Sequence, residues 1–211
     1  MENIIDSGET SSNADVVTLQ RALRLYFERN GFGDDGGYSA AWVDFELGPI
    51  PFPFPNTPGR KRAVPFHDLH HLVTGYRTDT IGEFEISAWE IGSGCRTFFT
   101  AWQINLSGLA TGALVAPRQI WRAFVRGRHS KNLYDRAYDA ALLSTTVGEA
   151  RRALGLDVPP PRATLKDILL FALAVAAGVV SGLLFFAAFA PLAVVAWPVL
   201  RVLRRSAALS S

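Results

Sequence analysis

Hydrophobic residues recur every three or four positions in several stretches of the chain, a spacing that places them on one face of an α-helix. The clearest stretch is residues 15–30, in which Asp15 offers an N-cap and Asn30 and Gly31 mark the end. Its apolar positions are Val16, Leu19, Leu23 and Tyr26. This pattern predicts an amphipathic helix near the start of the chain.

Further segments read as helices, at residues 66–73, 80–91, 97–115, 117–126 and 146–154. The first two are separated only by the connection TGYRTD, so they form a helix–turn–helix pair. Pro117 suits a first helical turn, and Gly155 suits a helix end. No segment shows the strict apolar–polar alternation of a half-buried strand. The chain is therefore expected to be all-α, with a compact helical domain.

Residues 31–66 interrupt the helical pattern, because their prolines are unsuited to both a helix interior and a central strand. These prolines are Pro49, Pro51, Pro53, Pro55, Pro58 and Pro65. We expect an ordered loop or extended segment here. Its apolar strip at residues 49–55 either packs on the core or closes over an apolar ligand or a membrane surface.

Residues 168–200 contain no charged side chain, and this run of 33 residues exceeds the ~20 that a transmembrane helix needs. Pro191 and Pro198 predict that it bends or breaks, either as one span at 168–189 with a kinked piece or as a helical hairpin. Basic residues on both flanks favour the hairpin, and a buried core hairpin is the alternative to a membrane segment. Gly178 and Gly182 would allow close helix contact, although such spacing is frequent in small-residue segments.

These patterns divide the chain into a flexible N-terminus at residues 1–14, a helical domain at 15–160, and a membrane anchor with a basic tail at 161–211. The net charge is only +2, from 21 basic and 19 acidic residues, so no strong field attracts nucleic acid. Cys95 is the single cysteine, which excludes an internal disulfide and a thiolate cluster. A metal site in this chain must therefore use histidine and carboxylate ligands.

Such ligands are concentrated in the helix–turn–helix pair. Three of the four histidines lie in the string Phe66–His71, and Glu83 follows at the start of the next helix. His67, Asp68 and His71 share one helical face, because residues three and four apart are neighbours on a helix. An antiparallel hairpin would bring Glu83 to the same place. Two imidazoles and two carboxylates suit Zn²⁺ or another first-row divalent ion, including Fe(II).

Each of these residues also has a simpler explanation. Thr80 and Glu83 match a capping box, in which the carboxylate would bond to the Thr80 amide. Asp68 would be favoured by the helix dipole if it lay in a first turn. Spacing alone does not decide between His70 and His71. The motif is not the zinc-peptidase motif, because Asp68 stands where that motif has its catalytic glutamate.

The string H-D-x-x-H-(x)11-E, formed by His67, Asp68, His71 and Glu83, resembles the signature of a ubiquinone (coenzyme Q) biosynthesis family, the fourth coenzyme Q protein. The resemblance covers roughly residues 15–155. It implies an all-helical fold, a bound divalent metal at these four positions, and His71 rather than His70 as ligand. It also implies oxidative decarboxylation, at ring carbon C1, of a polyprenylated benzoquinone precursor, with the metal ligands as the catalytic residues. An older view of the family is a lipid-binding scaffold that organises other quinone-biosynthesis enzymes.

The proline-rich strip and the apolar C-terminal run depart from the family pattern, and the second suggests an integral membrane anchor. The expected partners are a polyprenyl quinone precursor, membrane lipid and other quinone-biosynthesis enzymes, with a homo-oligomer left open and no nucleic acid. The expected location is the cytoplasmic face of a bacterial inner membrane, with an organellar inner membrane as the alternative. Enzyme and scaffold remain the two hypotheses, and a catalytic metal, Zn²⁺ or Fe, would make the chain a lyase-type decarboxylase.

Two further groups of side chains are candidates for ligand contacts. Aromatic residues that would line a pocket, or else belong to an ordinary core, are Trp89, Phe98, Phe99 and Trp102. Basic residues that would bind anionic lipid head groups, or else form a solvated face, are Arg118, Arg122, Arg126, Arg128 and Lys131.

Overall fold

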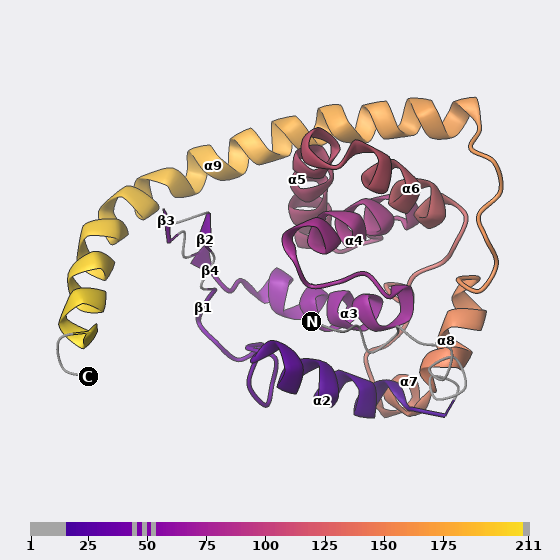
Figure 1. The fold of residues 1–211 in the computed structure, drawn as a ribbon, viewed down its shortest axis with the longest axis horizontal. Coiled ribbons are helices and arrows are strands. Elements are labelled where there is room, and N and C mark those ends of the chain that lie inside the picture. Colours follow the sequence, from indigo (N-terminus) through magenta and orange to yellow (C-terminus); the bar gives the residue numbers. More distant parts are fainter. Residues whose placement is uncertain (1–15, 44–45, 48–49, 52–53, 209–211) are drawn as a thin grey trace.

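The computed structural model describes residues 16–43, 46–47, 50–51 and 54–208. Its helices are α2 (Leu19–Asn30), α3 (Pro58–Thr74), α4 (Thr80–Ser93), α5 (Phe99–Val115), α6 (Pro117–Arg128), α7 (Ala140–Ser144), α8 (Val147–Leu154) and α9 (Leu165–Ala208). Helices α3 to α6 lie together in the middle of the molecule, and α9 arches over them (Figure 1). The predicted all-α fold is confirmed, because the strands within these residues are only two residues long.

Helix α2 packs beside α3 and ends where the sequence predicts. Gly31 closes it in the left-handed conformation, with φ of 68°, which glycine adopts without strain. The N-cap is Thr18, whose Oγ1 accepts a backbone hydrogen bond from the first turn. The predicted N-cap, Asp15, lies outside the described residues. Leu23 and Tyr26 are buried on the inner face, as the periodicity indicates.

The core is built where α4 crosses α6 and α5. Two glycines allow the first crossing, because a Cβ on Gly92 would meet the Phe124 carbonyl and one on Gly127 would meet the Trp89 carbonyl. The Trp89 side chain is fully buried at this crossing, and its indole nitrogen donates to Ser130 Oγ at 3.0 Å. The tight contact holds α4 in a fixed position relative to the rest of the domain.

Helix α3 corrects the prediction for residues 58–66, which are helical and not extended. Pro58 occupies the first turn, where a missing backbone N–H leaves no bond unmade, and Thr57 caps the helix. Pro65 lies inside the helix and is buried in the core. It removes one backbone hydrogen bond without ending a helix that is held by tertiary packing. The helix therefore begins eight residues before the predicted start at Phe66.

The described residues between 42 and 55 are extended, as predicted, and form two small antiparallel pairs. β1 (Trp42–Val43) pairs with β4 (Phe54–Pro55), and β2 (Glu46–Leu47) pairs with β3 (Ile50–Pro51). The Phe54 ring meets the Phe185 ring of α9 edge to face, at 5.7 Å between centroids. This end of the strip therefore packs against α9.

The segment after α6 leads to the short helices α7 and α8. Helix α8 begins and ends as predicted, with a complete capping box between Thr146 and Glu149 and with Gly155 as the C-cap. Helix α7 was not predicted, because its five residues are too few to show a period. Asp139 caps it through a hydrogen bond to the Leu142 amide.

Helix α9 is one continuous helix of 44 residues, so the predicted hairpin is not formed. Pro191 and Pro198 lie within it, and the helix curves away from the domain in its second half (Figure 1). Its first part, Leu165–Phe185, has a mean hydropathy of 2.6 and is long and apolar enough to cross a membrane. The coarse prediction of an apolar C-terminal membrane segment is thus supported by a single helix.

The beginning of α9 is attached to the domain by polar contacts. Thr164 and Asp167 bond to each other's backbone amides, which caps the helix. The Asp167 carboxylate also lies 3.3 Å from Arg128 Nε and 3.4 Å from His129 Nε2. Arg128 is the last residue of α6, and His129 is its C-cap. These contacts fix where the apolar helix leaves the domain.

Farther along, α9 packs lengthwise on α5. A Cβ on Gly178 would collide with the Leu106 carbonyl, so the close approach of the two helices needs a glycine there. Ser181 Oγ donates to the Gln103 carbonyl at 3.0 Å and lies 3.3 Å from Ser107 Oγ. Gly178 and Ser181, two small residues, therefore allow the close contact between α9 and α5.

The outward side of α9 is apolar from Ile168 onward along its first part, after the exposed Lys166 of its first turn. Its large exposed side chains are Leu165, Ile168, Leu169, Leu173, Val179, Val180, Leu183 and Leu184. The polar Ser181 and Asp167 face the domain. This distribution is the reverse of an amphipathic helix on a water-soluble protein and fits a helix that faces lipid.

Candidate metal centre

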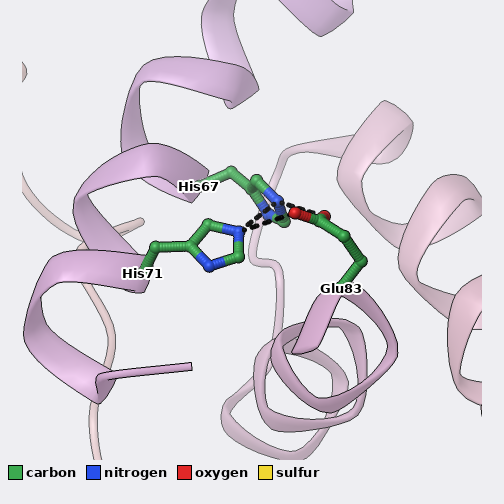
Figure 2. A group of neighbouring side chains, drawn as sticks. All are labelled: His67, His71 and Glu83. Carbon is green, nitrogen blue, oxygen red and sulfur yellow. Dashed lines mark hydrogen bonds and ion pairs between the residues drawn. The ribbon is translucent and has the colours of Figure 1, made fainter. Parts of the chain in front are cut away.

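The connection between α3 and α4 determines where Glu83 points. Gly75 ends α3 with a positive φ of 78°, and Asp79 caps α4 by accepting a hydrogen bond from the Gly82 amide at 2.9 Å. A Cβ on Gly82 would overlap the backbone of Arg77, so the turn passes close against the first turn of α4. Glu83 follows directly, with its side chain turned toward α3 (Figure 2).

Three side chains converge between these two helices. His67 Nε2 lies 3.3 Å from His71 Nε2 and 3.4 Å from Glu83 Oε2, and His71 Nε2 lies 3.3 Å from Glu83 Oε1. Figure 2 shows both imidazole rings and the carboxylate facing one point. The group can hold a metal ion, because each residue offers one ligand atom and these atoms lie within 4.8 Å of one another.

The predicted capping box between Thr80 and Glu83 is not formed. Asp79, one residue earlier, is the N-cap, so the carboxylate of Glu83 is free to reach the histidines. The prediction was wrong because two adjacent residues, Asp79 and Thr80, both suit an N-cap. In the structure Asp79 is the N-cap, and Thr80 is the first residue of the helix.

Hydrogen bonds on the far side of each ring determine which nitrogen faces the group. His67 Nδ1 lies 3.0 Å from Glu90 Oε1, and His71 Nδ1 lies 3.0 Å from the Tyr76 carbonyl oxygen. Both partners are acceptors, so each Nδ1 carries a proton and donates it. The neutral rings then have their lone pairs on Nε2, which is the arrangement that metal ligands need.

The separations also fit a metal ion. Ligand atoms about 2.0–2.1 Å from one tetrahedral ion stand about 3.3–3.4 Å apart. The two Nε2 atoms are 3.3 Å apart, and each lies 3.3–3.4 Å from a different oxygen of Glu83. Without an ion, burial alone would lower the pKa of His67, but the carboxylates of Glu90 and Glu83 raise it well above the usual range. An arriving cation would therefore displace a proton from this ring.

The group is open to solvent on one side. The side chains of Glu83 and His67 are 43% and 21% exposed, whereas His71 is almost fully buried behind the ring of Tyr26. Burial alone would raise the pKa of Glu83, but its contacts with His67 and His71 hold that pKa well below the usual range. A ligand can reach the group from the side of Glu83 and His67.

Asp68 lies next to this group but is engaged elsewhere. The Tyr38 hydroxyl donates to its Oδ2 at 2.5 Å, and the residue is buried. It does not lie in the first turn of α3, because that helix begins at Pro58, so the dipole explanation is wrong. Burial raises the pKa of Asp68 above the usual range. Its role as a fourth metal ligand stays a prediction.

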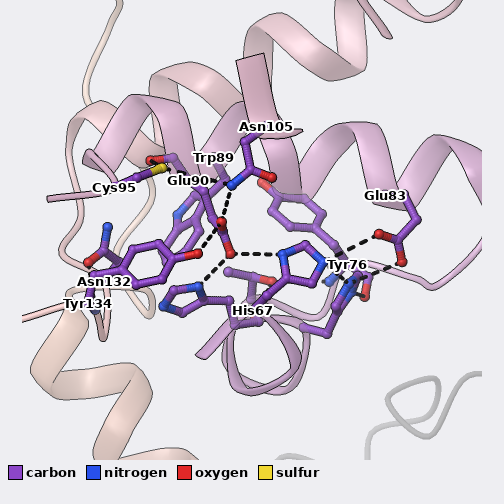
Figure 3. Close-up of polar contacts among 12 residues, drawn as sticks. His67, Tyr76, Glu83, Trp89, Glu90, Cys95, Asn105, Asn132 and Tyr134 are labelled. Carbon is purple, nitrogen blue, oxygen red and sulfur yellow. Dashed lines mark hydrogen bonds and ion pairs between the residues drawn. The ribbon is translucent and has the colours of Figure 1, made fainter. Parts of the chain in front are cut away.

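A buried polar network adjoins the group and was missed by the sequence reasoning. Its centre is Glu90, two turns after Glu83 on α4, and its other members are His67, His70, Asn105 and Tyr134 (Figure 3). His70 belongs to this network and not to the converging three, in agreement with the choice of His71. The available signal was the seven-residue spacing of the two glutamates, which places both on one helical face.

The aromatic and basic candidates do not gather around the three residues. Trp89 is a core residue, the Trp102 indole donates to the Arg96 carbonyl, and Phe99 is exposed at the start of α5. Phe98 packs among the rings of the core. The pocket wall expected from these residues is therefore not formed at this group.

The basic residues differ in their contacts, although Arg118, Arg122 and Arg126 follow one another at four-residue intervals along α6. Arg126 donates to the Thr74 carbonyl at 2.9 Å, and Arg128 pairs with Asp167. Arg118, Arg122 and Lys131 are exposed. Within the described residues, a shared head-group site of all five is not formed.

Comparison with known proteins gives no family for the chain, because family models, curated proteins and solved structures all fail to match it. The resemblance to the quinone-biosynthesis family therefore stays a prediction.

Proposed function

We propose that the chain is a membrane-attached, metal-dependent enzyme of ubiquinone synthesis that oxidatively decarboxylates a polyprenylated benzoquinone precursor at C1. Dioxygen is the oxidant: the bond from C1 to the carboxylate breaks, CO₂ leaves, C1 gains a hydroxyl group from water, and O₂ takes up the two electrons and is reduced to hydrogen peroxide. His67, His71 and Glu83 hold the ion, which we take to be Zn²⁺ or another first-row divalent ion such as Fe(II). Asp68 stands beside them. The proposal joins the motif resemblance to the geometry of the described site.

The observation that carries the proposal is the open, three-residue donor group. Structural zinc sites are closed by four protein ligands, whereas catalytic sites use three and leave a position for water or substrate. Here the converging donors come from His67, His71 and Glu83, and two of these side chains are reachable from solvent. This arrangement favours a site that acts on a ligand over one that only joins two helices.

The chain's own residues would orient the substrate and limit water. His71 is shielded by Tyr26, so a ligand approaches on the side of His67 and Glu83. The Tyr38–Asp68 hydrogen bond supplies a polar edge next to this approach. A bound divalent ion supplies positive charge that stabilises a ring carboxylate and the adjacent phenolate.

The apolar outer side of α9 supports a membrane location for this chemistry. A polyprenyl chain partitions into the bilayer, and a helix that exposes Leu173, Val180 and Leu184 has the same preference. We propose the cytoplasmic face of a bacterial inner membrane as the location. An ion site on a domain that is held at the membrane meets a lipid substrate without a separate carrier.

The second candidate is a non-catalytic lipid-binding scaffold for other quinone-biosynthesis enzymes. The exposed apolar surface favours it, because Leu114 and Val115 of α5 are also exposed, in addition to those of α9. The two candidates differ in turnover. A scaffold binds prenylated lipid but releases no product.

The test uses the full chain in phospholipid vesicles, loaded in turn with Zn²⁺ or Fe(II), in air. The probe is a prenylated hydroxybenzoate with a ¹³C-labelled carboxylate, and the readout is ¹³CO₂ by mass spectrometry. We expect release by the wild type and a loss of at least about 100-fold in Glu83→Gln, as for other groups that hold a catalytic charge.

Glu85→Gln is the matched control, because Glu85 lies on the same helix and makes no contact with the histidines in any described interaction. It should retain wild-type release. No release by metal-loaded wild type, with labelled lipid bound to the protein, would favour the scaffold. Equal release by Glu83→Gln would remove the site from the chemistry.

A further inference from the structure

The carboxylate of Glu90 has no contact with solvent, and its surroundings differ from those of Glu83. Its side chain is 0% exposed. Oε1 lies 3.0 Å from His67 Nδ1 and 2.7 Å from His70 Nδ1. Oε2 accepts from Tyr134 Oη at 2.7 Å and from the amide of Asn105. Figure 3 shows three of these donors, His67, Asn105 and Tyr134, around the carboxylate.

The protonation of these donors follows from their other partners. His70 Nε2 accepts a hydrogen bond from the Leu133 amide at 3.0 Å, so the proton of the neutral ring is on Nδ1 and points to Glu90. The Asn105 amide is a donor, and the Tyr134 hydroxyl at the same oxygen donates to it when the carboxylate is ionised. Four donors match the acceptor capacity of an ionised carboxylate, so Glu90 is a fully satisfied buried anion.

We propose that Glu90 is a positioning residue for the metal centre, because it holds His67 by Nδ1 and thereby directs Nε2 toward His71 and Glu83. The inference rests on the proposed metal site. Metal-bound histidines usually donate their second ring nitrogen to a carboxylate or carbonyl, which fixes the ring and raises its basicity as a ligand. His67 has the carboxylate form of this arrangement, and His71 has the carbonyl form through Tyr76.

The negative charge of Glu90 also supports its role as a positioning residue for the metal centre. With both imidazoles neutral, the charges of Glu83 and Glu90 together balance a divalent cation at a largely buried place. His70 and Asn105 hold the carboxylate from the other sides, so it stays directed at His67. The network therefore fixes the ligand before an ion arrives, which is how preorganised sites gain affinity.

The test is Zn²⁺ binding by competition with a chelator, measured on the full chain in mild detergent for wild type, Glu90→Gln and Tyr134→Phe. Glu90→Gln keeps the size of the side chain but removes its charge. We expect its Zn²⁺ dissociation constant to rise by ~10–100-fold. Tyr134→Phe is the matched control, because it removes a hydrogen bond from the far oxygen of the same carboxylate. It should change the constant by less than ~3-fold.

A second measurement separates positioning from general damage to the fold. In the Co²⁺-substituted protein the visible absorption bands report ligand geometry, so Glu90→Gln should shift them and Tyr134→Phe should not. If Glu90→Gln does not fold, Glu90→Asp is measured in its place. It keeps the charge but withdraws the carboxylate from His67, and it should also weaken Zn²⁺ binding.

The outcomes distinguish this inference from the proposed function. Absence of Zn²⁺ binding by folded wild type would overturn both. Wild-type binding with an unchanged constant and unchanged Co²⁺ bands in Glu90→Gln would overturn the role of Glu90 alone. An equal loss of affinity in Tyr134→Phe would show that the network stabilises the fold and does not position His67.

Discussion

The pair α3–α4 and the helix α9 differ in where their polar and apolar side chains lie. Between α3 and α4 the buried residues include Glu90, His70 and Asn105, each with hydrogen-bond partners. Among the described residues, no buried side-chain nitrogen or oxygen lacks a partner. Along α9 the outer side is apolar, and Ser181 faces inward. The domain thus buries a charged side chain, whereas α9 exposes apolar side chains.

The difference matches the requirements of two different surroundings, water for the domain and an apolar phase for the outer side of α9. A buried charge is tolerated only with enough hydrogen bonds, and the domain supplies four to Glu90. An exposed apolar helix is tolerated only where lipid or another apolar surface covers it. A substitution should therefore affect folding in the first region and membrane binding in the second.

The largest expected effect is on folding, in Glu90→Leu. The substitution would leave four buried donors without an acceptor, and each such group costs ~1–3 kcal/mol. We expect the free energy of unfolding to fall by at least ~4 kcal/mol, a large part of the ~5–15 kcal/mol of a typical domain. Urea unfolding followed by circular dichroism in mild detergent measures it. A loss below ~1 kcal/mol would contradict the account of the buried network.

The opposite kind of substitution, from an apolar to a charged residue on α9, should leave the stability of the domain unchanged. Leu173 is 66% exposed, and replacing it by glutamate puts a charge on the exposed apolar side of α9. We expect Leu173→Glu to weaken vesicle binding by ~3 kcal/mol, on the scale of charged residues in a membrane segment. The urea midpoint of the domain should stay the same. Flotation with phospholipid vesicles measures the binding, and unchanged flotation would contradict a lipid-facing α9.

The metal site should also respond to pH in a direction that follows from its carboxylates. They raise the pKa of His67 in the metal-free protein, so a proton must leave the ring before the ion binds. Zn²⁺ affinity should increase by roughly tenfold per pH unit below that pKa and level off above it. Calorimetry in buffers of different ionisation enthalpy counts the released proton. No proton release would mean that the ion does not bind His67.

The smallest effect concerns the contact between α9 and α5. Ser181→Ala removes the hydrogen bond to the Gln103 carbonyl, and we expect a loss of ~0.6 kcal/mol, the size found for polar contacts between apolar helices. We expect amide hydrogen exchange in residues 171–185 to rise about threefold. Val180→Ala is the control, because Val180 lies on the outer side. Equal exchange in the two variants would show that the serine contact does not hold α9 in place.

The sequence alone was sufficient for the helices that carry a clear period and a clear stop. Gly31 and Gly155 end α2 and α8 as predicted, because a glycine in the left-handed conformation is a local signal. The start of α3 was not predicted, because the prolines at 58 and 65 argue against a helix when considered singly. Packing of α3 on its neighbours decided the outcome, and no local pattern contains that information.

The candidate site could be predicted only in part for the same reason. Helical spacing brought His67 and His71 together, and the short connection brought Glu83 to them. The partner of Asp68, Tyr38, is 30 residues away in a segment without periodicity. The four donors to Glu90 come from α3, α5 and the segment after α6, so only the tertiary structure reveals that network.

The central claim is that His67, His71 and Glu83 hold a metal ion, and the most direct test is metal content by elemental mass spectrometry on purified, folded protein. The samples are wild type, His67→Ala with His71→Ala, and Asp68→Asn. We expect close to one divalent ion per chain in the wild type and in Asp68→Asn, and a loss to background in the double variant. No metal above background in the folded wild type, or equal metal in the double variant, would contradict the account.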